Sequence, residues 1–406
     1  MTPRHVPKPS ATRSRRSIAS AAAVALTLVV AGCGSSEDDG SASPATTTSE
    51  DTAAADTTAP DTGDRETDDT TASTAPATSQ PVDGEAADDP ACAPLAEPAS
   101  IKISALQLLP YLPVHIAEHL GYFDEEGIDL TIENLRSSEA LPLLGQGDID
   151  YMIAPVSAQL FNAIDAGVEL RWASPLNTAN PESMNGLWVK AELFPPEEDE
   201  FDWTKMKGRT MVSSTGHGGV LTYVAGPHML EAGMSIDDIT ALAMPSADLI
   251  VALENGSVDM AWAPSPFWER LVGNPDFRFV EGFPPEPASD IGIIAGPSMS
   301  DRPEVAAAFF RALMRAIEDN LQGGDYLEDE ASRQLIAEAV GLEEADLDVE
   351  APNLFDPRLD PGDLEAFTRN QQVMIDLGSL LEYDEPIPVE DLVDLRGLDA
   401  ARECLS

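Results

Sequence analysis

Short β-rich runs alternate with amphipathic segments of about ten residues from Ile101 onward, and this alternation constrains the fold more than any other feature of the chain. Pro113 near the start of one predicted helix and Gly121 after its end stand where helices favour these residues. The pattern predicts an α/β fold with mainly parallel strands. The first unit has predicted strands at 102–106, 128–133, 151–153 and 170–173, and predicted helices at 112–120, 139–144 and 157–165.

A second unit repeats this architecture after a loop at 195–207. Its predicted strands are 210–213, 239–242 and 259–262, and its predicted helices are 220–231 and 247–255. A return strand is predicted at 291–295 and a long helix at 304–321, started by Pro303 and stopped by Gly323-Gly324. The residues after this long helix have a pattern that indicates helix or loop, and we assign them to the first unit. The 406 residues suffice for two domains, because single cores rarely exceed about 250 to 300 residues.

The beginning of the chain has the pattern of a targeting segment. Five basic residues precede the apolar run 18–30, which is too short to span a bilayer comfortably. The run ends in Val30-Ala31-Gly32-Cys33, which resembles the lipobox of bacterial lipoproteins. Residues 1–33 are therefore predicted to be a lipoprotein signal peptide that leaves Cys33 lipidated, on the extracytoplasmic face of the cell membrane. A plain secretory signal is the alternative, and Ser14-Arg15-Arg16 leaves the twin-arginine route open beside general secretion.

The segment 34–97 contains Thr, Ser, Ala, Asp, Glu and Pro with almost no large apolar side chains. Such a segment cannot bury enough apolar surface to offset the entropy of ordering, so we expect a disordered tether. Fifteen acidic residues and one arginine lie between 34 and 90, and their mutual repulsion extends the tether.

The formal charge of −49 is not confined to the tether, because 57 acidic residues face 17 lysines and arginines from Ala91 onward. This acidic composition, with only five lysines, resembles proteins of salt-loving organisms, where screening reduces the self-repulsion. No basic stripe interrupts the negative charge. Nucleic acid is therefore excluded as an expected partner.

Two cysteines remain besides Cys33, namely Cys92 and Cys404, at the two ends of the predicted folded region. In an oxidising compartment they are predicted to form a disulfide, although sequence cannot show that the ends meet. The positions of these cysteines in the sequence do not have the spacing of metal ligands.

Four motifs carry a family resemblance that extends from Ile101 to about Glu318. They are PVHIAEHLGYFDEEGID at 113–129, LGQGDIDYMIA at 144–154, MKGRTMVSSTGHGG at 206–219 and MPSADLIVALENGSVDMAWAPSPF at 244–267. In this order they resemble the solute-binding proteins of the nitrate, sulfonate, taurine and thiamine-pyrimidine group. The resemblance implies a periplasmic-binding-protein type II fold with two lobes. Lobe 1 would contain 98–180 and the return segment 289–406, and lobe 2 would contain 181–288.

The resemblance also implies a function. The protein would capture a small molecule in the cleft between the lobes and deliver it to the permease and ATPase subunits of an ABC importer, as a monomer without cofactor or catalysis. Two alternatives stay open. One is the ligand-binding subunit of a sensory system, and the other is a secreted enzyme similar to the synthase of the thiamine pyrimidine, whose cysteine-rich motif this chain lacks.

Candidate ligand-binding residues follow predicted strands, where open α/β sheets bind their ligands. The Gly-rich turn before the helix at 220–231 presents backbone N–H groups suited to an anionic or electron-rich oxygen. Trp262 and Pro264 belong to an aromatic loop that stacks a planar ligand or packs the lobe, and Asn177 and Ser289-Asp290 are hinge or ligand residues. Because these candidates include no clustered Arg or Lys, they favour a planar, pyrimidine-like ligand over a sulfonate or nitrate. The full set is Gln107, Tyr111, Ala154, Pro155, Asn177, Ser214, Thr215, Gly216, His217, Gly218, Trp262, Pro264 and Asp290.

Three histidines are candidates for chemistry. His217 lies in the Gly-rich turn without an identifiable nucleophile or acid partner, so we expect it to donate a hydrogen bond or to be exposed. His115 and His119 have a metal-compatible spacing, but no third ligand is in view. We expect no metal site.

Overall fold

The computed structural model describes residues 92–282, 291–343 and 347–405. The predicted signal peptide with Cys33, nearly all of the predicted tether, and Asp290 lie outside these ranges. Among the described residues, no helix is long and apolar enough to cross a membrane.

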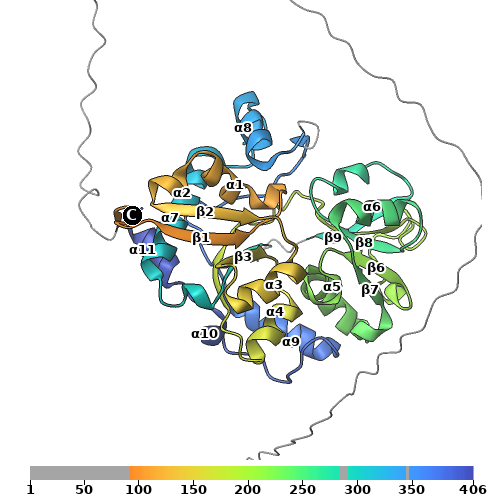
Figure 1. The fold of residues 1–406 in the computed structure, drawn as a ribbon. Coiled ribbons are helices and arrows are strands. Elements are labelled where there is room, and N and C mark those ends of the chain that lie inside the picture. Colours follow the sequence, from red (N-terminus) through yellow and green to blue (C-terminus); the bar gives the residue numbers. More distant parts are fainter. Residues whose placement is uncertain (1–91, 283–290, 344–346, 406) are drawn as a thin grey trace, which may run out of the picture. The chain divides into compact units, whose positions relative to one another are not determined.

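The first sheet has the strand order β2-β1-β3-β10-β4 (Figure 1). Strands β1, β2 and β3 are parallel, whereas β10 runs antiparallel to both β3 and β4. The strands of this first sheet are β1 (Ala99–Ser104), β2 (Ile128–Glu133), β3 (Tyr151–Ala154), β4 (Arg171–Pro175) and β10 (Gly292–Ala295). We call this sheet and the helices packed on it lobe 1.

The helices of lobe 1 are α1 (Leu112–His119), α2 (Tyr122–Glu125), α3 (Ser137–Gln146), α4 (Ala158–Asp165) and α7 (Pro303–Asn320). Gly121 separates α1 from α2 with φ of 76°, a left-handed conformation that glycine adopts at little cost. Helix α7 buries most of its length in the main core, where Phe309 stacks on Phe123 and Tyr151. A helix enclosed on so many sides anchors the lobe.

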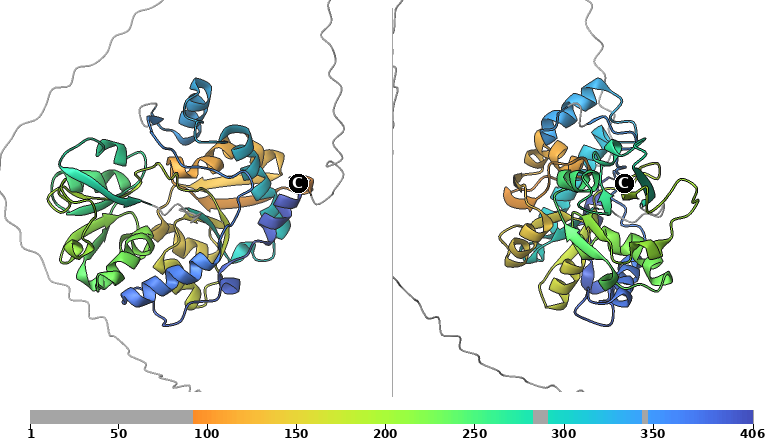
Figure 2. Two further views of the ribbon diagram at one scale, coloured as in Figure 1. Left: turned by 180° about the vertical axis from the view of Figure 1, so that it is seen from behind. Right: turned by 90° about the vertical axis from the view of Figure 1, so that its right-hand side faces the viewer.

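The second sheet has the strand order β7-β6-β8-β5-β9. It contains β5 (Gly186–Lys190), β6 (Thr210–Ser213), β7 (Thr240–Ala243), β8 (Met260–Ala263) and β9 (Phe277–Gly282). Strand β6 is parallel to β7 and β8, and β5 is antiparallel to β8 and β9. This sheet, with α5 (Val220–Glu231) and α6 (Ser246–Glu254), is lobe 2. Figure 2 shows the two sheets, each with its own helices.

The C-terminal segment adds α8 (Glu330–Val340), α9 (Glu365–Leu377), α10 (Val389–Leu392) and α11 (Arg396–Glu403). Helix α11 packs on α7 of lobe 1. Helix α9 contacts both lobes. Phe367 and Met374 belong to a cluster with Phe161 of α4, whereas Leu377 belongs to the core of lobe 2 beside α5. The predicted return of the whole segment 289–406 to lobe 1 therefore differs from the structure at α9, which lies beside α4 and α5 (Figures 1 and 2).

The two ends of the described chain meet in lobe 1. Cys92 and Cys404 form a disulfide with an S–S distance of 2.06 Å and a Cα–Cα distance of 5.4 Å. Arg311 of α7 donates to the Ala93 carbonyl at 3.1 Å and pairs with Glu126. The N-terminal residues are thus held to the same helix that anchors the core.

Candidate ligand-binding site

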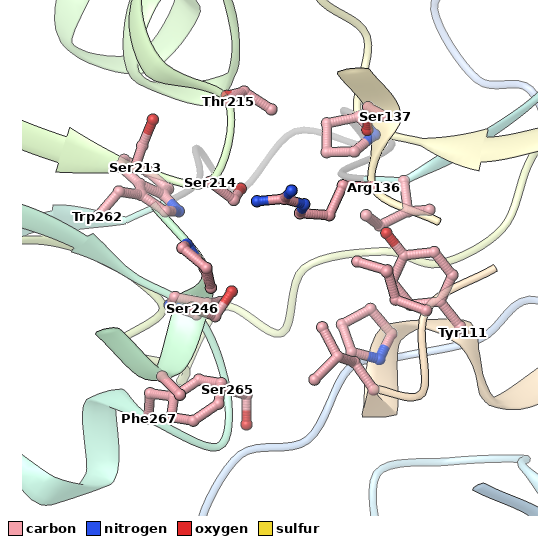
Figure 3. Close-up of a pocket in the computed structure, with 18 of the residues that line it drawn as sticks. Tyr111, Arg136, Ser137, Ser213, Ser214, Thr215, Ser246, Trp262, Ser265 and Phe267 are labelled. Carbon is pink, nitrogen blue, oxygen red and sulfur yellow. The ribbon is translucent and has the colours of Figure 1, made fainter. Parts of the chain in front are cut away.

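A cavity of about 390 Å³ lies between the two sheets, and its wall comes from both lobes (Figure 3). Lobe 1 contributes the loop after β1, the start of α3 after β2, and the loop after β3. Lobe 2 contributes the loops after β6 and β8 and the start of α6 after β7. All six segments follow strands at their carboxyl ends, where parallel strands leave a crevice for ligands.

Much of the wall is apolar. Tyr111 and Trp262 are almost fully buried, and Figure 3 shows Tyr111 and Trp262 on opposite sides of the cavity with Phe267 below Trp262. Aliphatic residues complete this part of the wall, including Leu106, Leu108, Pro110, Pro155, Met244 and Ile291. These side chains would enclose the carbon skeleton of a small organic molecule.

One guanidinium enters the cavity from lobe 1. Arg136 is the N-cap residue of α3, and its side chain extends toward Ser214 of lobe 2 (Figure 3). Its Nη2 lies 2.8 Å from Glu139 Oε1, and Glu139 Oε2 accepts the backbone N–H of Arg136 at 3.1 Å. The side-chain and backbone hydrogen bonds from Arg136 keep the pKa of Glu139 below its usual value.

Two helix N-termini also face the cavity. In α3 the first helical hydrogen bond runs from Glu139 N to Arg136 O, and in α6 it runs from Asp248 N to Pro245 O. The earlier amides, those of Ser137 and Ser246 among them, are therefore not used by the helices themselves. Both starts line the cavity, and helix N-termini favour anionic groups. Hydroxyl groups surround them, from Ser137, Ser213, Ser214, Thr215, Ser246 and Ser265.

The structure brings seven of the predicted ligand-binding residues to this cavity. They are Gln107, Tyr111, Pro155, Ser214, Thr215, Trp262 and Pro264.

The other predicted residues lie elsewhere. Ala154 is fully buried at the end of β3, and the Asn177 side chain accepts a hydrogen bond from Ile291 N at 3.0 Å, which joins the connection after β4 to the start of the return strand. Gly216 and Gly218 are buried in a short 3₁₀ helix, where a Cβ on Gly218 would lie 2.6 Å from Ala158 Cβ of α4. His217 lines a separate cavity of about 250 Å³ beside α4.

The histidine pair of α1 has local partners. His115 is buried with Nε2 2.8 Å from the Leu106 carbonyl, and burial lowers the pKa of its imidazole. His119 lies 3.9 Å from Glu338 of α8. Within the described ranges no three His, Cys, Asp or Glu side chains gather to hold a metal ion.

Sequence reasoning missed the polar lining from α3 and α6. Arg136 and Ser137 follow the strand 128–133, just as Gln107 follows β1. The rule that ligands bind beyond the carboxyl ends of the strands therefore pointed to these two residues as well. Ser246 and Ala247 follow β7 in the same way. Arg136 lines the cavity, whereas the predicted candidates included no Arg or Lys. Further lining residues outside the predicted set are Asn134, Asn185, Ser265 and Phe267.

Two sheets with a cavity between the carboxyl ends of their parallel strands define the periplasmic-binding-protein fold, as the sequence resemblance implied. The family model described as NMT1/THI5 like matches residues 110–323, and the chain belongs to this family. No curated protein shows a significant match to the sequence.

Solved structures share the fold at low sequence identity. The alkanesulfonate-binding protein SsuA from Xanthomonas axonopodis pv. citri, bound to MOPS, has a TM-score of 0.56 and 18% identity, covering 73% of this chain and 99% of that one. The nitrate-binding protein NrtA from Synechocystis PCC 6803 has a TM-score of 0.56 and 14% identity, and the match covers 77% of this chain and 89% of NrtA. The aliphatic sulphonate-binding protein SsuA from Escherichia coli has a TM-score of 0.52 and 16% identity, and the match covers 73% of this chain and 92% of that SsuA.

Proposed function

We propose that this protein is the extracytoplasmic solute-binding component of an ABC importer and that it captures a small organic anion. It is anchored through Cys33, closes its lobes on the solute, delivers the solute unchanged to a permease with its ATPase, and catalyses no reaction. The family and the fold support the binding role, since the similar structures named above are of sulfonate-binding and nitrate-binding proteins.

The observation that carries the solute class is the convergence of Arg136 with the N-termini of α3 and α6 on one cavity. A guanidinium and helix-start amides stabilise a sulfonate or carboxylate. The apolar wall with Tyr111, Trp262 and Phe267 suits an organic body attached to that group. A cavity of about 390 Å³ lies toward the small end of ligand sites, which span about 300–1,000 Å³.

A planar heterocycle is the second candidate solute. Trp262 and Phe267 lie together on the lobe 2 side of the cavity, and aromatic rings stack on planar ligands (Figure 3). A pyrimidine would use these rings and the serine hydroxyls, and would leave Arg136 without an anion to bind.

A ligand screen with the full-length chain in high salt tests the proposal. Thermal unfolding would be followed with butanesulfonate, MOPS, taurine, benzoate, nitrate and an aminopyrimidine, and the compounds would be recovered and identified afterwards. A ligand bound only by the folded state raises the melting temperature once its concentration passes Kd. We expect a saturable rise with an organic sulfonate or carboxylate that is recovered unchanged. A rise with the aminopyrimidine alone would contradict the anion, and chemical conversion would contradict the binding role.

A transport assay separates the importer from a sensory subunit. The lipidated protein would be reconstituted in vesicles with the permease and ATPase subunits encoded beside its gene. The proposal expects the solute to stimulate ATP hydrolysis only when this protein is present. Binding without any such stimulation would favour the sensory alternative.

A further inference from the structure

Ser265 connects the cavity to a carboxyl group behind its wall. Ser265 lines the cavity from the loop after β8, beside Phe267 (Figure 3). Its Oγ lies 3.1 Å from Oε1 of Glu269, which belongs to the short 3₁₀ helix Trp268–Arg270. Ser265 itself is 3% exposed, so its hydroxyl has few partners besides Glu269 and whatever occupies the cavity.

Glu269 is poorly placed to carry a negative charge. Its Oε2 is buried without a hydrogen-bond partner among the described residues. The neighbouring Trp268 and Leu271 belong to an apolar cluster of lobe 2. Burying an oxygen of an ionised carboxylate without a hydrogen-bond partner is unfavourable, so a carboxyl in this position favours its protonated form.

The charged neighbours do not relieve this cost. Glu350, on the segment after α8, faces Glu269 with the same sign of charge. The next residue, Arg270, pairs with Glu254 of α6 at 2.9 Å. Burial first, and Glu350 to a lesser extent, raise the pKa of Glu269 to about 7, although its own backbone N–H and its hydrogen bond with Ser265 act in the opposite direction.

The protonation state of Glu269 decides which way the Ser265 hydroxyl points. A serine hydroxyl has one hydrogen to donate, and an ionised carboxylate can only accept. When Glu269 is ionised, the Ser265 hydrogen is committed to Oε1 and only lone pairs face the cavity. When Glu269 is protonated, its O–H donates to Ser265 Oγ, and the Ser265 hydrogen is free to donate to a ligand.

We propose that Glu269 is a proton-controlled positioning residue for Ser265, so that capture of an anionic solute is accompanied by proton uptake at Glu269 and weakens as pH rises from about 6 to about 8. The inference rests on the proposed function, because it takes the solute to be an anion. Ser265 donates a hydrogen bond to that anion from the lobe 2 side, while Arg136 approaches from lobe 1.

Calorimetry with butanesulfonate, which does not titrate in this range, tests the inference on the full-length chain at constant ionic strength. Titrations at pH 6, 7 and 8 in phosphate and in Tris give Kd and the number of protons taken up, because the two buffers differ in ionisation enthalpy. We expect Kd to rise by up to about tenfold between pH 7 and pH 8, with a fraction of a proton taken up at pH 7.

Glu269→Gln is the decisive variant, since its amide does not titrate and offers an N–H donor to Ser265 Oγ at every pH. We expect a Kd that stays near the low-pH value at every pH and no proton uptake. Glu192→Gln removes the same charge at an exposed site of lobe 2 and should retain the wild-type pH dependence. If Glu269→Gln fails to fold, Ser265→Ala serves instead, with weaker binding that no longer depends on pH.

The outcomes separate this inference from the proposed function. Butanesulfonate binding with one Kd at pH 6 and pH 8, or without proton uptake, would overturn the role of Glu269 and leave the binding function intact. No binding of butanesulfonate at either pH would refute the solute class, and this inference with it. Carbon-13 titration of labelled glutamates gives a further check without ligand. The signal that is lost in Glu269→Gln should titrate near pH 7, and titration below pH 5 would refute the role.

Discussion

Arg136 is the residue from which we expect the largest effect on solute binding. A hydrogen bond to a charged group contributes about 1.5–3 kcal/mol, so Arg136→Gln should weaken organic sulfonate binding by about tenfold to a hundredfold. The melting temperature should change little, because the Arg136 side chain is 57% exposed and its pair with Glu139 lies at the surface. Arg369→Gln is the matched control, because it breaks the exposed pair between Arg369 of α9 and Asp363 before that helix. An unchanged Kd for Arg136→Gln would contradict the anion site.

Glu269 should also make the stability of the ligand-free protein depend on pH. Its folded pKa of about 7 exceeds the ordinary value of 4.5, so the folded state binds more protons than the unfolded state between these values. Stability is therefore lost as pH rises from about 4.5 to about 7, and the full penalty remains above pH 7. Glu269→Gln should be more stable than wild type at pH 8, by about 1–2 kcal/mol after allowance for partial exposure, and equal at pH 4.5. Thermal unfolding at both pH values checks the difference, and a constant difference would contradict it.

How much of the site could be predicted depended on the kind of signal each residue carries. Ser214, Thr215 and Trp262 stand in recognisable motifs and line the cavity. Arg136 stands outside the four motifs, and its approach to lobe 2 depends on how the lobes are arranged. Glu269 was not predicted because its chemistry arises from burial and from a segment about eighty residues away, which no local pattern records.

At the scale of elements, α9 joins the cores of the two lobes, and Leu377 carries its contact with lobe 2. Leu377 is 1% exposed, so Leu377→Ala should lower the free energy of unfolding by about 2–4 kcal/mol. Asp376→Ala alters the neighbouring exposed residue and should cost less than about 0.5 kcal/mol. Urea unfolding measures both variants. Equal values for the two would show that α9 does not stabilise lobe 2.

The parallel strands were predictable because their β-rich runs alternate with marked helices. Strand β6 and helix α5 have the predicted bounds, whereas β5 and β9 were not predicted at all. Leu187, Trp188 and Val189 of β5 are all buried, so no alternation of polar and apolar residues marks this antiparallel strand. The segment that forms α9 was predicted to be helix or loop. Its contact with lobe 2 joins residues far apart in the sequence, so no local sequence pattern indicates it.

At the scale of the whole molecule, the charge of −49 predicts a stability that depends on salt. Self-repulsion among carboxylates destabilises the compact state, and the Debye length falls from about 10 Å at 0.1 M to about 3 Å at 1 M salt. We expect the melting temperature to rise by several degrees between about 0.1 M and 1 M KCl. Sucrose of equal osmolality is the control for general solute effects. A flat response to KCl would show that the carboxylates are too well solvated to repel one another.

The disulfide between Cys92 and Cys404 gives the described fold the topology of a closed ring. A single cut between Gly323 and Gly324 would leave two pieces that remain one molecule until the bond is reduced. The ring also makes the position of the ends arbitrary. A circularly permuted gene that joins the two old ends and opens the chain at this Gly-Gly turn should encode the same fold, with its new ends at the turn after α7.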